Sequence, residues 1–392
     1  MVNYVVDAAR TMNPKKIVVV LGRKRPQVRE VLAKDACVVY QEKPLGTADA
    51  VKAAKNAIPP SVKDVVVLYG DTPLITEKTI QGLYDFHLEK DVACTVLTTF
   101  LNNPRGYGRI LRNDRGQFIG IMEDKDANFQ QKSIREINTG MYCFKKDDLL
   151  EGLQHVKPFN QSGEFYLTDV VGWLFNKNRK IDACVTDVSL EVLGVNSLQE
   201  LREASCIVHA RTLDKFTESG VFIMDYSTTF INASAKIEAG TKIFPFTLIE
   251  KDVVIGKGCF VGPYCHLRVG AILKEGVSVG NFTEVKNSVL EDHVVMRHMG
   301  YLGDTKVGKK VNIGAGTVVA NFDGKKKNKT IIREKAFIGC DTVLIAPVVV
   351  GKNAVVGAGS VVTRGHNVRD GAIVVGVPAR EIKGPKNRKK QS

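Results

Sequence analysis

The sequence predicts two folded parts, an α/β domain followed by a parallel β-helix. Between residues 231 and 362 a branched or long apolar residue returns at almost every sixth position. Between residues 16 and 98 short apolar runs alternate with helical stretches. The 392 residues, 44% of them hydrophobic, are enough to build two cores.

Charge and cysteine content restrict the class of protein. The net charge of +14 indicates anionic partners, and the basic tail, 383–392, accounts for part of it. Eight cysteines without a CxxC pair are typical of a reduced, cytoplasmic protein. No apolar run approaches the roughly 20 residues that span a membrane, and residues 1–16 lack a signal-peptide pattern. We therefore expect a cytoplasmic protein without membrane insertion.

In the first half, the apolar runs 17–21, 36–40, 65–69 and 93–98 are expected as strands, with helices over 26–32, 47–56 and 77–87. Such alternation predicts a doubly wound sheet that binds ligands at the carboxyl ends of its strands. The run Val65-Val-Val-Leu-Tyr-Gly-Asp71 delivers a carboxylate to that edge. Asp71 is either a Mg²⁺ ligand beside substrate phosphates or the cap of a turn or helix.

Seven strings carry a family resemblance, in order and in spacing. They are QEKPLGTA (41–48), YGD (69–71), GYGR (106–109), EDKD (123–126), EINTG (136–140), GEFY (163–166) and GVN (194–196). With them the first half resembles the sugar-1-phosphate nucleotidyltransferases, specifically the bifunctional N-acetylglucosamine-1-phosphate uridylyltransferase family. The resemblance implies a Rossmann-like nucleotidyltransferase domain. It implies uracil binding by Gln41, Gly46 and Thr47, sugar binding by Gly108, Glu123 and Asn138, and Mg²⁺ binding by Asp71 and Asn196.

The start of the sequence departs from this family. The family opens with a strand and a Gly-rich loop around the nucleotide phosphates, whereas residues 1–9 resemble the helix that follows that loop. Nucleotidyl transfer depends on positioning and charge neutralisation, so we expect an N-terminally truncated domain with impaired uridylyl transfer. Two alternatives stay open, a fragment of an intact bifunctional enzyme and a scaffold that binds a nucleotide-sugar without turnover.

A helix joins the two halves. Ser197-Leu-Gln-Glu200 is a capping box, and apolar residues continue a helical face towards Gly220. The expected domains are therefore a nucleotidyltransferase-like domain over 1–196, a linker helix over 197–220, a β-helix over 221–382 and the basic tail.

A six-residue period is the mark of a parallel β-helix, and interruptions of the period indicate where function lies. The first interruption, 287–306, contains His298, whose imidazole suits proton removal near neutral pH, although a lone histidine is more often structural. The second interruption, 320–330, is a Lys-rich loop between two coils. Its lysines either bind a phosphate group or are exposed to solvent without a ligand.

Five further strings cover the second half: GNFTEVK (280–286), HMGYLGD (298–304), VNIGAG (311–316), ANFDG (320–324) and IAP (345–347). They resemble the acetyltransferase half of the same bifunctional family. The resemblance implies a left-handed β-helix, a homotrimer with sites between neighbouring coils, and acetyl transfer from acetyl-CoA to the amine of glucosamine-1-phosphate. The implied partners are small molecules, including UTP or UDP-N-acetylglucosamine, and not nucleic acid.

The same resemblance implies roles for single residues. His298 accepts the proton of the amine, and Glu284 orients that histidine. Sugar-phosphate binding is implied for Arg268, Lys286, Tyr301, Asn312 and Lys327, and acetyl-CoA binding for Ala315, Asn321, Phe322, Cys340 and Ala358. A thioester is already activated, so direct attack needs only deprotonation, positioning and backbone N–H groups for the oxyanion.

Three departures in the second half concern the substrates. Phe322 stands where relatives often have Tyr, Cys340 where Ser is usual, and Val269 where Pro follows the Arg. The first two each weaken one hydrogen bond by about 0.5–1.5 kcal/mol, so we expect altered acetyl-CoA affinity. A rival interpretation is a zinc-dependent hydratase of the γ-carbonic anhydrase type, in which His293 and His298 bind Zn²⁺ with His266.

Overall fold

The computed structural model describes residues 1–23, 26–32, 36–158 and 163–382, and the predicted basic tail lies outside them. The chain divides into two compact units between Ser205 and Cys206. The structure contains no helix, among the residues it describes, that is long and apolar enough to cross a membrane.

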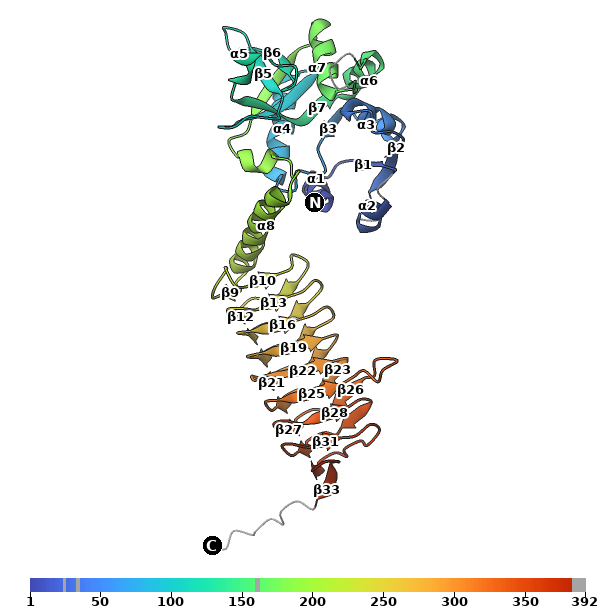
Figure 1. Cartoon of the computed structure of the whole chain (residues 1–392), viewed down its shortest axis with the longest axis vertical. Helices are drawn as coiled ribbons and strands as arrows, with labels where there is room; N and C mark the ends of the chain where they lie inside the picture. Colours follow the sequence, from blue (N-terminus) through green and yellow to red (C-terminus); the bar gives the residue numbers. More distant parts are fainter. Residues whose placement is uncertain (24–25, 33–35, 159–162, 383–392) are drawn as a thin grey trace. The chain divides into compact units, whose positions relative to one another are not determined.

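The first unit is an α/β domain built on a mixed sheet (Figure 1). The sheet has the order β6-β5-β7-β4-β8, with β3 paired to β7. Its helices are α1 (Val2–Thr11), α2 (Pro26–Val31), α3 (Thr47–Ala54), α4 (Glu77–Lys90), α5 (Phe129–Lys132), α6 (Lys146–His155) and α7 (Leu167–Asn176), with short 3₁₀ helices at Lys55–Ala57 and Ser189–Val192. Its strands are β1 (Val18–Gly22), β2 (Cys37–Gln41), β3 (Asp64–Val67), β4 (Cys94–Phe100), β5 (Arg109–Arg112), β6 (Phe118–Met122), β7 (Glu136–Lys145) and β8 (Ile181–Val185).

The α/β class is confirmed, but the sheet differs in detail from one doubly wound sheet. Strands β1 and β2 pair only with each other among the described strands, and β3 and β4 both run antiparallel to β7. β7 is buried along nine of its ten residues and so forms the centre of the core. Strand β1 is mostly half-buried.

Helix α8 (Leu198–Glu218) begins with the predicted capping box. Ser197 Oγ accepts a hydrogen bond from the Glu200 N–H at 3.2 Å, and Glu200 Oε2 accepts one from the Ser197 N–H at 2.7 Å. Both bonds satisfy N–H groups that a helix start leaves unpaired. The division between the two units falls inside this helix.

The second unit is a β-helix made of three parallel sheets, in which each strand pairs with one in the next coil (Figure 1). The eight-stranded sheet holds β10 (Phe230–Ile231), β13 (Leu248–Ile249), β16 (Cys265–Leu267), β19 (Thr283–Lys286), β22 (Gly300–Gly303), β25 (Thr317–Ala320), β28 (Val343–Ile345) and β31 (Val361–Val362). The seven-stranded sheet holds β11 (Lys236–Ile237), β14 (Val254–Ile255), β17 (Ile272–Leu273), β20 (Val289–Leu290), β23 (Thr305–Val307), β26 (Thr330–Ile332) and β29 (Val348–Val350). The ten-stranded sheet holds β9 (Phe222–Ile223), β12 (Lys242–Ile243), β15 (Phe260–Val261), β18 (Ser278–Val279), β21 (Val295–Met296), β24 (Asn312–Ile313), β27 (Phe337–Ile338), β30 (Val355–Val356), β32 (Ile373–Val375) and the terminal antiparallel β33 (Arg380–Ile382).

The residues that carry the six-residue period form the core of this unit. They are Ile231, Ile237, Ile243, Ile249, Ile255, Val261, Leu267, Leu273, Val279, Val285, Val307, Ile313, Val319, Ile332, Ile338, Leu344, Val350, Val356 and Val362, and all belong to one buried cluster. Burial of each such side chain contributes about 1.5–3 kcal/mol. The column is continuous because every coil adds one inward residue from each of its three strands.

The predicted interruption at 287–306 is smaller than expected. Leu290, Met296 and Leu302 continue the buried column, so the period is shortened by one residue before Leu290 and again before Val307. The second interruption is a true insertion, since residues 321–329 lie between β25 and β26 outside any strand.

The two neighbouring isoleucines of β26 test this account of the core. Ile332 faces inward and is 1% exposed, whereas Ile331 faces outward and is 41% exposed. We expect Ile332→Ala to destabilise the coil by about 2–5 kcal/mol, because a cavity adds to the lost burial. Ile331→Ala is the matched control and should cost less than about 1 kcal/mol. Equal losses in urea unfolding followed by circular dichroism would contradict the inward column.

Candidate functional site

The two predicted Mg²⁺ ligands of the first unit converge on Gly194. A Cβ placed on Gly194 would lie 3.4 Å from Asn196 Nδ2 and 3.5 Å from Asp71 Oδ2. The Val195 N–H donates to the Asp71 carbonyl at 2.8 Å, and this hydrogen bond holds the backbone next to Gly194 close to Asp71. The carboxylate and the amide carbonyl oxygen suit Mg²⁺, which usually takes its other ligands from water and substrate phosphates.

The predicted uracil residues lie around a turn that only glycine can form. Gly46 has φ +119°, and a Cβ there would overlap the Phe165 backbone. Gln41 Nε2 donates to the Gly46 carbonyl at 3.1 Å, and Thr47 Oγ1 accepts from the Leu167 N–H at 2.9 Å. The loop therefore presents these three residues on a rigid backbone.

The predicted sugar residues also come together. A Cβ on Gly108 would lie 3.5 Å from both Asn138 Cβ and Glu123 Oε2, and the Asn138 N–H donates to the Gly108 carbonyl at 2.8 Å. Glu123 Oε1 accepts from Thr168 Oγ1 at 2.9 Å. Burial raises the pKa of Glu123, because a charged carboxylate is poorly solvated there.

Sequence reasoning gave no role to Tyr69, which links the uracil and sugar residues. Its hydroxyl hydrogen-bonds with Thr47, and burial raises its pKa to about 12. Its ring covers Gly140, which has φ +79° and where a Cβ would overlap the ring. The strings YGD and EINTG contain Tyr69 and Gly140, but their spacing in sequence does not show that they touch.

In the second unit, His298 lies on an outer edge of the β-helix and is exposed. Its carbonyl accepts a hydrogen bond from Oγ1 of the buried Thr283 at 3.0 Å, which anchors the backbone while the ring faces outward. The apolar column therefore does not contain this imidazole.

Three of the predicted acetyl-CoA residues continue the same edge on the following coils. The Gly316 N–H donates to the Met299 carbonyl at 2.8 Å, the Asp341 N–H to Ala315 at 2.6 Å and the Gly359 N–H to Cys340 at 2.8 Å. These bonds stack the turns that follow the ten-stranded sheet. We call this row the His298 edge; it comprises residues 297–299, 314–316, 339–341 and 357–359.

Cationic residues gather at the turns that follow the eight-stranded sheet. We call this row the Arg268 edge; it comprises Arg268, Lys286, Asp304 and the loop 321–329. The pKa of Lys286 is lowered, chiefly by contact with the Lys327 ammonium and then by Arg268. Lys286 and Lys327 repel each other unless an anion binds, and Arg268, paired with Glu284, lies beside them, so the arrangement suits a phosphate group.

Two anchoring acids shape this edge, and sequence reasoning missed both. Asp323 accepts hydrogen bonds from the Lys325 and Lys326 N–H groups at 2.9 and 2.8 Å, and these bonds hold its pKa well below its usual range. They fold the loop that carries Lys327. Glu250 accepts from the Val269 N–H at 3.0 Å and contacts His266 Nε2 at 2.9 Å.

Several predicted residues lie beside members of another predicted set in the structure. Glu284 accepts a hydrogen bond from Arg268 Nη1 at 2.7 Å, and its predicted role toward His298 stays a prediction. Asn321 lies on the Arg268 edge, where its Nδ2 donates to Asp304 Oδ2 at 2.6 Å, and Phe322 follows it there. These placements separate Asn321 and Phe322 from the other acetyl-CoA residues within one chain.

The remaining sugar-phosphate residues lie on different faces. Tyr301 belongs to β22, and its hydroxyl and Asn321 Nδ2 both approach Gly303, where a Cβ would overlap them. Asn312 belongs to β24 in the ten-stranded sheet, opposite Val295. Tyr301 thus belongs with the Arg268 edge and Asn312 with the sheet that leads to the His298 edge.

The geometry does not favour the zinc interpretation. In the part of the chain that the structure describes, no three His, Cys, Asp or Glu side chains are grouped to hold a metal. The ring of His266, the required third ligand, contacts Glu250 instead.

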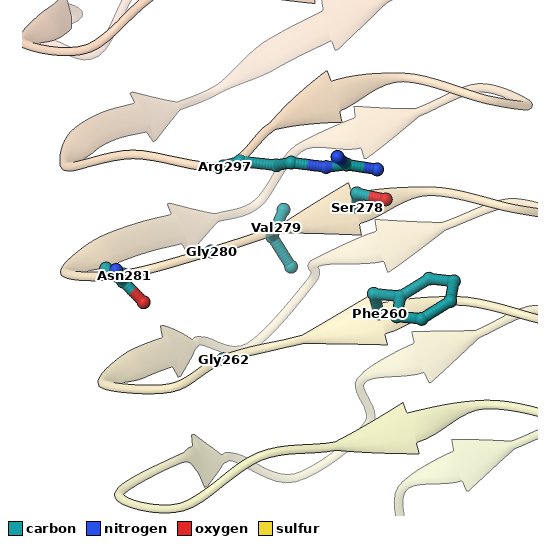
Figure 2. A pocket seen from close by; sticks show the side chains of 7 residues that line it. All are labelled: Phe260, Gly262, Ser278, Val279, Gly280, Asn281 and Arg297. Atoms are coloured by element: carbon teal, nitrogen blue, oxygen red, sulfur yellow. The ribbon is translucent and has the colours of Figure 1, made fainter.

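A groove lies on the ten-stranded sheet, and its lining includes Arg297, the residue that precedes His298 in the sequence (Figure 2). Phe260 and Arg297 form its walls, and Ser278 lies between them. Gly262, Val279, Gly280 and Asn281 complete the lining. No sequence pattern pointed to this groove, because its members come from three coils.

Known proteins share both units. The family model for the MobA-like NTP transferase domain matches residues 1–116, and that for the bacterial transferase hexapeptide (six repeats) matches 234–269 and 329–364. Together with the two clustered sites, these matches define a two-part transferase, with a nucleotidyltransferase-like unit and a left-handed β-helix of hexapeptide repeats.

Curated relatives extend the similarity over most of the chain. The bifunctional protein GlmU of Acetivibrio thermocellus is 39% identical over 93% of this chain and 86% of its own length. That of Heliobacterium modesticaldum is 39% identical, and that of Clostridioides difficile 38%, each over 98% of this chain and 90% of its own length. The chain belongs to the GlmU family of bifunctional proteins, which confirms the predicted resemblance. Enzymes of this type use acetyl-CoA, and Mg²⁺ in the nucleotidyltransferase half.

Glu123 should make the stability of the first unit depend on pH. Its raised pKa means that the folded state favours the protonated form of the carboxyl. The stability associated with this protonated carboxyl is fully present below the unfolded pKa, about 4.3, and is lost as pH rises through the folded pKa. Glu123→Gln stays neutral and should therefore be more stable than the wild type at pH 7.5, with the difference vanishing near pH 4.

Urea unfolding followed by the fluorescence of Trp173, the single tryptophan, measures this unit. Glu89→Gln, at an exposed carboxylate, is the matched control. A Glu123→Gln variant that is less stable at pH 7.5, or a difference independent of pH, would refute the assignment.

Proposed function

We propose that the second unit transfers the acetyl group of acetyl-CoA to the amine of glucosamine-1-phosphate, in the synthesis of UDP-N-acetylglucosamine. The observation that carries the proposal is the exposed His298 on the same edge as Ala315, Cys340 and Ala358. A base fixed on a rigid coil, in line with a row of small residues that a long thin cofactor can follow, is what direct transfer requires.

The reaction needs one proton to move. The amine nitrogen attacks the thioester carbonyl while His298 takes its proton, a C–N bond forms, and the C–S bond then breaks to release the CoA thiolate. The protonated imidazole can return its proton to that sulfur. Backbone N–H groups of the turns would stabilise the oxyanion.

The cations of the Arg268 edge would neutralise the sugar phosphate. Glu284 holds the Arg268 guanidinium, and Asp323 folds the loop of Lys327, so both act as positioning residues. The His298 edge and the Arg268 edge follow different sheets, and a site that uses both is completed when the His298 edge of one copy meets the Arg268 edge of another. We therefore propose a homotrimer with three sites between neighbouring coils.

For the first unit we propose the binding of UTP or UDP-N-acetylglucosamine with Mg²⁺. The convergence of Asp71 and Asn196, and the contacts among Gly108, Glu123 and Asn138, support it. The cytoplasmic location and the altered acetyl-CoA affinity stay predictions.

His298 can be tested by thiol release from acetyl-CoA with glucosamine-1-phosphate as acceptor. His298→Ala should lower kcat by about 10²–10⁴-fold, since a positioned general base contributes that much. His366→Ala, at an exposed histidine that contacts Thr363, should keep the wild-type rate. A His298→Ala protein with full turnover would remove this residue as the base.

The site between copies can be tested by mixing two inactive variants. Arg268→Ala damages one edge and His298→Ala the other, so equal mixing of refolded subunits should restore about a quarter of the wild-type sites in a trimer. Sedimentation of the unmixed protein should give three copies of the 43.0 kDa chain. Mixed trimers without regained activity would mean that each site lies within one chain.

A further inference from the structure

The turn that begins at Arg268 has the features of a type II β-turn. The Ala271 N–H donates to the Arg268 carbonyl at 2.9 Å, and Gly270 has φ +80°. A positive φ at the third of four residues is typical of this turn type, which favours Pro at its second position. Val269 occupies that second position, where relatives have Pro after the Arg. The turn therefore lacks the ring that would restrict its backbone at this residue.

Valine supplies a backbone N–H that proline does not have, and Glu250 accepts a hydrogen bond from it. Glu250 follows β13, one coil before the turn, and its Oε2 accepts from the Val269 N–H at 3.0 Å. The pKa of Glu250 is lowered, chiefly because this N–H stabilises the charged carboxylate. The other oxygen, Oε1, contacts His266 Nε2 at 2.9 Å. The carboxylate is thus held from two sides.

The same carboxylate lies beside the Arg268 side chain. Glu250 Oε1 is 3.7 Å from Arg268 Nε, which is buried and makes no hydrogen bond within the described part of the chain. On the following coil, Glu284 accepts a hydrogen bond from Arg268 Nη1 at 2.7 Å. These two contacts involve Nε and Nη1, and Nη2 takes part in neither. Acids one coil before and one coil after Arg268 therefore limit where its guanidinium can lie.

We propose that Glu250 is a positioning residue of the acetyl transfer, which ties the Arg268 turn to the preceding coil and replaces the restraint of a proline. It holds the turn through the Val269 N–H and so directs the Arg268 guanidinium towards the phosphate of glucosamine-1-phosphate. The proposal rests on the proposed function of the second unit, and Glu250 acts in it through Arg268 and not by contact with the phosphate. A turn that is already restrained loses less conformational freedom when the phosphate binds.

The test measures KM for glucosamine-1-phosphate at saturating acetyl-CoA. We expect Glu250→Ala to raise this KM about fivefold, because a less restrained guanidinium makes a weaker hydrogen bond to the phosphate, with kcat within about twofold. Glu250→Gln can still accept from the Val269 N–H through its carboxamide oxygen and should recover part of the loss. Glu334→Ala, at a partly exposed acid paired with Lys352 beside the seven-stranded sheet, is the matched control and should keep the wild-type KM.

Substitutions of Val269 separate this role from a general effect of the Glu250 charge. Proline removes the N–H and restricts the turn by itself, so in a Val269→Pro background Glu250→Ala should change KM less than about twofold. In a Val269→Ala background, which keeps the N–H, Glu250→Ala should raise KM about fivefold, as in the wild type. Equal effects in the two backgrounds would overturn the proposal, as would an unchanged KM in Glu250→Ala alone.

Amide hydrogen exchange followed by mass spectrometry gives a readout independent of turnover. The segment 268–271 should exchange faster in Glu250→Ala than in the wild type, because one of its N–H groups loses its acceptor, and Glu334→Ala should leave it unchanged. Unchanged exchange in Glu250→Ala would overturn the proposal. A wild-type protein that fails to acetylate glucosamine-1-phosphate would overturn the proposed function instead, and the exchange data with calorimetric affinities for glucosamine-1-phosphate would still decide on Glu250.

Discussion

The stacking of inward side chains in the β-helix sets the positions of everything outside it. Each coil contributes one apolar residue from each of three strands, and each strand bonds to the strand one coil further on. Such a thin coil has no second layer to bury its apolar face, so mutual stacking must supply the favourable burial. A residue that leaves the period would expose its neighbours, and the register is therefore fixed from coil to coil.

A fixed register turns outward residues into rows. The rings of Phe246, Tyr264 and Phe282 stack along one edge, with centroids 4.6 and 4.9 Å apart, and Met299, beside His298, takes the equivalent position on the next coil. The two shortened steps, before Leu290 and before Val307, flank the coil that carries this histidine. The local changes in the period thus occur where the chemistry is proposed, and the column beneath them stays intact.

The sequence was sufficient to predict the β-helix, because a six-residue period is a one-dimensional pattern whose inward positions need no knowledge of distant contacts. It was also sufficient for the groups around Asp71 and Glu123, since the family strings name their members. It did not predict that Glu284 pairs with Arg268, because the period gives the inward positions and does not specify which outward side chains of the neighbouring strands β16 and β19 contact each other. The sheet of the first unit differs from the predicted doubly wound sheet for a related reason. An apolar run such as 17–21 predicts that a strand forms but does not predict which strand it pairs with. Tyr69 and the groove around Ser278 were missed because their partners come from separate elements.

The central claim is that a rigid apolar column holds His298 outward, within reach of the acceptor amine. The most direct measurement is a crystal structure of the protein with glucosamine-1-phosphate and CoA. The account predicts the amine nitrogen within about 3 Å of an imidazole nitrogen of His298, with the phosphate held by arginine or lysine side chains. An acceptor bound with its amine out of hydrogen-bonding reach of that ring, directly or through one water, would contradict it.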